Sequence, residues 1–184
     1  MSIRIKRARG GRVDVTLGEG EVALLRHLLE ELLTLLDEGA GAGQADQDPL
    51  AAAVGIGTST RTPDDPVLAR LLPDAYREDP DAASEFRRYT EDGLRARKRA
   101  AAGTVLATLG APGERVRLQP DEAQAWLLAL NDLRLALGTR LGVTEDIEEM
   151  VESMGDDDDR MYGLLVYDHL TGMQELLVRS LSRS

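Results

Sequence analysis

Two histidines, His27 and His169, are the first candidates for metal chemistry in this chain. Neither has a second histidine three or four residues away, the spacing that places two ligands on one face of a helix. Asp156–Asp159 are consecutive acids, whereas a calcium loop needs ligands at alternate positions and a glycine at the sixth. We therefore predict no metal site. His27 is expected on a helix surface and His169 near the core with a hydrogen bond; a two-histidine site completed by a carboxylate is the alternative.

Motifs for other kinds of catalysis are missing from the sequence. There is no cysteine, which excludes thiolate nucleophiles, zinc–thiolate sites and disulfides within this chain. Neither Gly-x-Ser-x-Gly nor Ser-x-x-Lys occurs, and the glycine pairs at 41–43 and 55–57 lack the Gly-Lys-Ser/Thr of a phosphate loop. We predict no catalytic residue, no cofactor and no enzymatic activity. An enzyme that uses a carboxylate pocket near Arg134, Arg140 and Asp168 is the alternative.

Basic residues form two clusters in a chain whose formal net charge is −11. Within so acidic a protein, a local basic cluster is a candidate contact for phosphates or for an acidic protein surface. Internal pairing with the many acids, or a solvated face, is the alternative. Neither cluster contains the interleaved aromatics of a surface that stacks single-stranded bases, so a protein partner is favoured over nucleic acid. The candidate partner surface comprises Arg4, Lys6, Arg7, Arg9 and Arg12, together with Arg95, Arg97, Lys98 and Arg99.

A third group of polar residues lies within or beside otherwise apolar helical segments. Buried polar groups must be paired, and a network of them would fix the register of neighbouring helices. A ligand pocket is the alternative. The candidate polar network comprises Tyr76, Arg77, Asn131, Asp132, Arg134, Thr139, Arg140, Tyr167 and Asp168.

Three short segments alternate apolar and polar residues as β-strands do. Residues 3–5 and 13–17 lie on either side of a Gly-Gly pair, which predicts a β-hairpin. Residues 115–119 alternate again, with Val116 and Leu118 as the apolar pair, and we predict a third strand there. A lone hairpin is marginal in water, so this sheet must pack on helices.

Leucine dominates the apolar content, with one Phe and one Trp, and this composition favours helix-on-helix packing. Apolar residues recur at helical spacing in the remaining segments. Asp65-Pro66 and Asp79-Pro80 are typical starts of helices, and Gly142 is a typical end. The predicted helices run over 19–37, 66–72, 80–109, 120–141 and 161–181.

Two segments interrupt this pattern: a flexible insertion at about 39–63 and an acidic loop at about 144–160. Neither flank has enough apolar residues for its own core, so we predict one domain over 1–184. The expected fold is mainly α (α+β), a helical bundle with a small β-hairpin or three-stranded sheet at one side. No apolar stretch approaches the roughly 18 residues of a membrane helix, and residues 2–12 are not a hydrophobic leader, so the expected location is the cytoplasm.

Several separated segments of the sequence resemble one protein family. They are Leu71-Leu72-Pro73-Asp74-Ala75-Tyr76-Arg77, Glu85-Phe86-Arg87-Arg88-Tyr89-Thr90-Glu91, Trp126 with Leu130-Asn131-Asp132-Leu133-Arg134-Leu135, Gly138-Thr139-Arg140-Leu141, and Tyr167-Asp168 with Gln174-Glu175. In this order they resemble an actinobacterial domain-of-unknown-function family that includes the oxidative-stress transcriptional regulator AosR. The likeness covers nearly the whole chain apart from 39–63.

The resemblance implies a non-enzymatic cytoplasmic protein that controls transcription under oxidative stress by contact with a sigma factor or the transcription machinery. Genes of the family often lie beside the adaptor ClpS, which implies, as an alternative, an accessory role in Clp-regulated proteolysis. A redox-sensing member needs a cysteine pair, so thiol sensing does not carry over to this chain. A nucleic-acid-binding module that uses the basic clusters is a further alternative. A homo-oligomer formed through the leucine-rich first helix is compatible with each.

Overall fold

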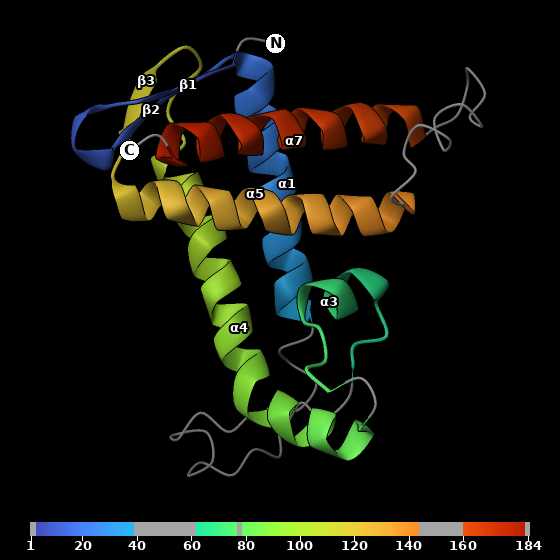
Figure 1. The fold of residues 1–184 in the computed structure, drawn as a ribbon. Helices are drawn as coiled ribbons and strands as arrows, with labels where there is room; N and C mark the ends of the chain where they lie inside the picture. Colours follow the sequence, from blue (N-terminus) through green and yellow to red (C-terminus); the bar gives the residue numbers. More distant parts are fainter. Residues whose placement is uncertain (1–2, 39–61, 77–78, 144–159, 183–184) are drawn as a thin grey trace.

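The structure is a computed structural model, and it describes residues 3–38, 62–76, 79–143 and 160–182. Three strands lie at one end of the molecule, and the helices extend away from them (Figure 1). In chain order the elements are β1 (Ile3–Arg7), a 3-10 turn (Arg9–Gly11), β2 (Val13–Leu17), α1 (Glu19–Glu38), α3 (Pro66–Leu71), α4 (Pro80–Thr108), β3 (Arg115–Leu118), α5 (Pro120–Leu141) and α7 (Arg160–Ser182).

The strands form one antiparallel sheet in the order β1-β2-β3. Its register pairs Ile5 with Val15, and Val15 in turn with Val116. Gly10 and Gly11 each have a φ of 72° in the turn between β1 and β2. Residues other than glycine rarely adopt this backbone conformation, so the Gly-Gly pair determines where the hairpin turns.

The helices pack in two crossing pairs. α5 and α7 lie side by side, and α1 and α4 run across them (Figure 1). α5 contacts α1, α3, α4 and α7, so it is the central helix of the bundle. Trp126 on α5 is buried, and its indole Nε1–H donates a hydrogen bond of 2.8 Å to Oγ1 of Thr108 on α4. This bond satisfies the one polar atom of the largest core side chain.

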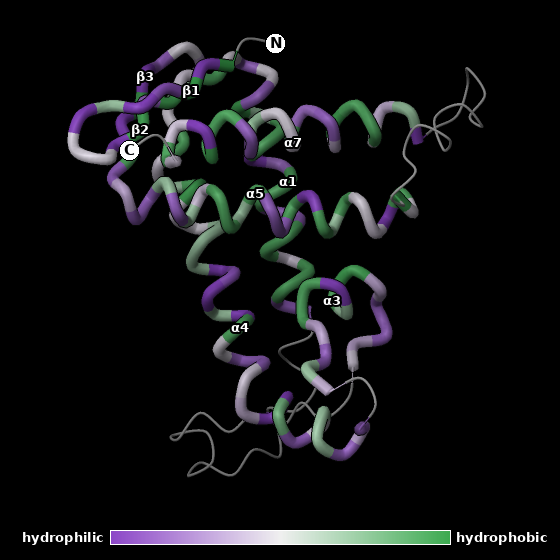
Figure 2. The backbone as a smooth tube through the Cα atoms, viewed as in Figure 1, coloured by the Kyte–Doolittle hydropathy of each residue, from purple (hydrophilic) through white to green (hydrophobic). Residues whose placement is uncertain are grey.

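The core lies between the inner face of the sheet and the helices. Val13, Val15, Leu17 and Leu118 point from the sheet into it and are almost completely buried. Hydrophobic residues run along most of α1, whereas the first turns of α4 are largely hydrophilic (Figure 2). The start of α4 therefore stands apart from the core.

Side-chain caps begin the helices at the predicted places. Asp65 accepts hydrogen bonds from the backbone N–H groups of Val67 and Leu68, and Asp79 accepts one from Ala82. Gln119 and Glu122 form a capping box at the start of α5, and Gly142 ends that helix with a φ of 68°. Such caps satisfy backbone groups that a helix end leaves unpaired.

The predicted fold class is confirmed: a helical bundle carries a small three-stranded sheet at one side. The predicted insertion at about 39–63 and the acidic loop at about 144–160 lie outside the described residues except for 62, 63 and 160. Among the helices that are described, none combines the length and apolar character needed to span a membrane.

Candidate protein-interaction surface

The face of the sheet that points away from the core is basic. Residues on this face alternate with the buried apolar ones, so Arg4 and Lys6 project from β1 and Arg115 and Arg117 from β3. The register places Arg4 and Arg115 on either side of Thr16, and Lys6 and Arg117 on either side of Asp14. Two rows of basic side chains therefore flank the middle strand.

The hairpin turn extends the same surface. Arg9 and Arg12 are exposed there, and Nε of Arg12 donates a hydrogen bond of 3.1 Å to the side chain of Gln119. Arg7, also predicted for this surface, is exposed at the end of β1 but pairs with the core-facing Val13, so it lies on the opposite face of the sheet. The basic sheet face, as we name it, comprises Arg4, Lys6, Arg9, Arg12, Arg115 and Arg117.

One carboxylate lies in the middle of the basic sheet face. Asp14 on β2 accepts hydrogen bonds of 2.7 and 3.1 Å from Nε and Nη2 of Arg117. The hydrogen bond from Arg117 lowers the pKa of Asp14 below its ordinary value. This planar pair fixes the Arg117 side chain against the sheet, while Arg4, Lys6 and Arg115 stay directed to solvent.

The second predicted basic cluster does not form one surface. Arg95 is buried, and its guanidinium donates to Glu91 and to the backbone carbonyl of Leu36. Arg99 donates to the same carbonyl and pairs with Asp37. Both arginines thus satisfy the C-terminal end of α1, where carbonyls are unpaired and positive charge is favourable. Lys98 pairs with Asp132 on α5, which leaves Arg97 as the exposed residue among these four.

The predicted polar network is divided among separate places in the structure. Asp132 belongs to the pair with Lys98. Arg134 on α5 donates to Thr171, Gln174 and the hydroxyl of Tyr167 on α7, and its guanidinium lies 5.2 Å from the centre of the Tyr167 ring. These contacts join α5 to α7.

The other members of that group lie apart from both sets. Thr139 bonds back to the carbonyl of Leu135 within α5, Asn131 is half-buried, and Arg140 and Asp168 are exposed. Tyr76 stacks edge-on against Phe86. Arg77 lies outside the described residues.

The two histidines lie on different helices. His27 is exposed on α1, whereas His169 on α7 is half-buried. Nε2 of His169 is buried and has no hydrogen-bond partner among the described residues, so the predicted hydrogen bond is not made at that atom. No group of three metal-binding side chains occurs in the described part of the chain, and Asp156–Asp159 lie outside it.

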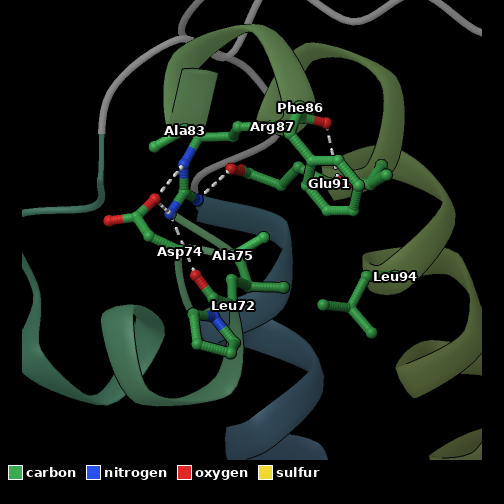
Figure 3. Close-up of a pocket in the computed structure, with 10 residues that line it drawn as sticks. Leu72, Asp74, Ala75, Ala83, Phe86, Arg87, Glu91 and Leu94 are labelled. Carbon is green, nitrogen blue, oxygen red and sulfur yellow. Dashed lines mark hydrogen bonds and ion pairs between the residues drawn. The ribbon is translucent and has the colours of Figure 1, made fainter. Parts of the chain in front are cut away.

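Arg87 forms a network that was not predicted from the sequence. Its guanidinium donates to Asp74, to Glu91 and, at 3.1 Å, to the backbone carbonyl of Leu72 (Figure 3). Glu91 also binds Arg95, so a row of ion pairs runs from the loop after α3 along α4, and a hydrogen bond from Arg95 to the carbonyl of Leu36 links it to the end of α1. The spacing of 87, 91 and 95 at every fourth residue was the available signal.

The hollows near these residues are too small for a substrate. Three hollows lined by described residues have volumes of about 20, 10 and 40 Å³. The first lies beside Arg87 (Figure 3), and the third includes Arg140. A water molecule needs about 10–15 Å³ and a ligand pocket about 300–1,000 Å³, so these three hold a few waters at most. The exposed basic sheet face is therefore the stronger candidate site.

The family of the chain follows from comparison with known sequences. The model of a domain of unknown function, DUF2017, matches residues 2–181. The chain belongs to this family. No solved structure matches the chain.

Relatives of this family member carry a functional name. "Oxidative stress regulator AosR" of Mycobacterium tuberculosis and the protein of the same name from Mycobacterium bovis are each 36% identical to it over 154 residues, which cover 76% of this chain and 70% of the relative. A Mycobacterium leprae relative that carries the AosR name is 35% identical over 191 residues, which cover 97% of this chain and 86% of the relative. The names of these relatives are those of regulators.

Proposed function

We propose that this chain is a non-enzymatic regulator of the oxidative-stress response, and that its basic sheet face binds an acidic surface of a sigma factor. The observation that carries the proposal is the gathering of six basic side chains on one exposed surface of a protein with a net charge of −11. The names of the mycobacterial relatives support the regulatory role. The family resemblance supplies the sigma factor as the partner.

The composition of the basic sheet face favours a protein partner over nucleic acid. Residues 3–17 and 111–119 contain no aromatic side chain on which a base could stack. Nucleic acid remains the second candidate because arginines on a sheet can also bind phosphates.

The proposed mechanism needs no thiol switch in this chain. Cysteine is absent, so oxidation to a sulfenic acid or a disulfide has no residue on which to occur. The oxidant signal would then be carried by the partner or by the amount of this protein. Binding to the partner is accordingly expected to be the same in reducing and in peroxide-containing buffer when the partner itself carries no cysteine.

Binding of the purified chain to mycobacterial sigma factors tests the proposal. The sheet-reversed variant, Arg4→Glu/Arg115→Glu, changes two exposed side chains that have no hydrogen bond or ion pair among those described. We expect it to bind at least about tenfold more weakly than wild type, because reversed charge repels the acidic partner. The control Arg26→Glu/Arg97→Glu makes the same change of charge on exposed helix positions and should bind as wild type does.

A gel shift with duplex DNA separates the two candidates. Binding to DNA would weaken steeply with salt, since several phosphate contacts release counterions. If DNA binds at physiological salt with the sheet-reversed variant inactive, while no sigma factor binds, the protein partner is wrong and the nucleic-acid alternative is right. If the sheet-reversed variant binds both as well as wild type does, the basic sheet face has no part in the function.

A further inference from the structure

The end of the molecule opposite the sheet carries exposed aromatic side chains. We call this end the tip and define it as the described residues between 62 and 92, which form α3, the loop after it and the first turns of α4 (Figure 1). Tyr76, Phe86 and Tyr89 are 51%, 44% and 54% exposed there. They are half of the six aromatic residues of the chain. Large side chains of this kind mark interaction sites when they gather on a surface.

The aromatic residues of the tip are held in place before any partner arrives. The rings of Tyr76 and Phe86 meet edge to face with centroids 5.9 Å apart. Phe86 and Tyr89 are three residues apart on α4, so they lie on one side of that helix. Tyr76 lies in the loop after α3. Arg87 on α4 holds this loop by hydrogen bonds to Asp74 and to the carbonyl of Leu72. A preformed surface loses little conformational entropy when it binds.

The charge of the tip is opposite to that of the sheet. The tip holds eight acidic and three basic residues, and one of each, Glu91 and Arg87, is buried in the ion-pair row. Asp81, Glu85 and Asp92 are exposed on α4 close to the aromatic residues along the helix. The sheet end, residues 3–17 and 111–119, holds seven basic and two acidic residues. The two ends therefore complement each other in charge.

We infer that the tip of one copy of this chain binds the basic sheet face of a second copy. Arginine side chains stack on exposed tyrosine and phenylalanine rings and pair with nearby carboxylates, and the sheet face offers five arginines for both contacts. Because the two surfaces lie at opposite ends, a bound pair keeps one free tip and one free sheet face. Association is thus head-to-tail and extends into short chains of molecules.

The net charge of −11 does not prevent this contact at physiological salt. The screening length is about 8 Å at 0.15 M ionic strength, which is shorter than the distance between the two ends of the molecule. Repulsion between the bodies of two copies is therefore screened more than the pairing of side chains in contact. We expect association to be strongest at moderate salt and to be lost at about 1 M salt.

Self-association would regulate the proposed function, and this step rests on that function. A copy whose basic sheet face is covered by a tip cannot bind a sigma factor through the same face. The partner and a second copy therefore compete, and the fraction of sheet faces that stays free falls as the protein accumulates.

Sedimentation velocity over a range of protein concentrations tests the contact itself. We expect the mean mass of wild type to rise above 20.0 kDa with concentration. The tip-reversed variant, Glu85→Lys/Asp92→Lys, and the sheet-reversed variant should each self-associate at least about tenfold more weakly. A mixture of the two variants should associate again, because each supplies the surface that the other lacks. A wild type that stays at 20.0 kDa to about 0.5 mM at moderate salt overturns the inference.

Two further variants separate the contribution of the tip from that of net charge. Glu30→Lys/Asp168→Lys makes the same change of net charge on exposed positions of α1 and α7, and it should associate at least as well as wild type. If it dissociates like the tip-reversed variant, net charge and not the tip governs association. Phe86→Ser/Tyr89→Ser leaves the charge unchanged and should weaken association, with folding verified by circular dichroism. The tip-reversed variant should still bind the sigma factor, so failure of either proposal is seen separately.

Discussion

Nζ of Lys98 on α4 lies 2.6 Å from Oδ1 of Asp132 on α5, and both side chains are largely buried. Burial raises the pKa of Asp132, and the hydrogen bond from Lys98 opposes that rise. The pair joins α4 and α5, the two helices that the Trp126–Thr108 hydrogen bond also connects, so its loss should lower the stability of the core. Removing one partner of a buried pair leaves the other charge uncompensated, whereas replacing both by apolar residues often costs little.

Each single substitution in this pair should therefore lower the free energy of unfolding more than the double substitution does. We expect Lys98→Met and Asp132→Leu each to lower the free energy of unfolding by about 3 kcal/mol. The double variant should lie within about 1 kcal/mol of wild type. Urea unfolding followed by the fluorescence of Trp126 measures all three. Losses that simply add in the double variant would show that the two charges do not stabilise each other.

Arg87 should contribute more to stability than its neighbour on α4. Arg87→Met removes hydrogen bonds to Asp74, Glu91 and the carbonyl of Leu72, and we expect it to cost about 3 kcal/mol of unfolding free energy. Arg88→Met changes an exposed side chain one position away and should cost less than about 0.5 kcal/mol. Thermal unfolding of the two variants side by side gives the comparison. Equal losses would contradict the structural role of the Arg87 network.

Asp74 should stabilise the fold at neutral pH and lose that effect in acid. Hydrogen bonds from Thr62 and then from Arg87 lower the pKa of Asp74 below 3.8. A lowered pKa adds stability that is complete above the value of the unfolded chain and is lost as pH falls through the folded value. Asp74→Asn should thus be less stable than wild type at pH 7 by about 1 kcal/mol, allowing for solvent screening of this partly exposed group.

The urea midpoints of wild type and Asp74→Asn at pH 7 and at about pH 3 test this dependence. The two midpoints should converge at the lower pH. Thr62→Val removes the hydroxyl partner of Asp74 and should reduce the pH-dependent difference without abolishing it. A gap between Asp74→Asn and wild type that stays constant over this range would mean that the carboxylate charge is not responsible.

The hydrogen bond between Trp126 and Thr108 should contribute measurably to the free energy of unfolding. Thr108→Val keeps the shape of the side chain but leaves the buried indole N–H without its acceptor. We expect a loss of about 1–3 kcal/mol in unfolding free energy, the cost of an unpaired buried donor. Thr104→Val, one turn earlier, removes a hydroxyl that bonds within α4 and should change stability by about 0.5 kcal/mol or less. Differential scanning calorimetry distinguishes the two.

Local features of the sequence were sufficient to predict the elements of this fold. Alternation predicts β1, β2 and β3, because each strand has one buried face. Asp65-Pro66 and Asp79-Pro80 predict helix starts, since their caps act over three residues. Each of these sequence patterns lies within a few residues of the strand or helix end that it predicts.

The candidate site was predictable in part, because some of its contacts join distant positions. Arg95, Lys98 and Arg99 form a basic run in the sequence, yet their partners are a carbonyl at Leu36 and a carboxylate at Asp132. A run of like charge gives no indication of such partners. Arg115 and Arg117 belong to the basic sheet face because β3 pairs with β2. The alternation of residues 115–118 predicts which side of the strand these two arginines occupy. It does not predict which strand lies beside them.

The third strand of the sheet comes late in the chain. Arg117 and Asp14 are 103 positions apart in the sequence, and α1, α3 and α4 lie between β2 and β3. During synthesis the hairpin leaves the ribosome long before the strand that completes it, and a two-stranded hairpin is marginally stable alone. Contacts of such long sequence separation also form slowly. The surface assembled here thus exists only in molecules whose translation has passed Leu118, and a partner that requires it will ignore unfinished or truncated products.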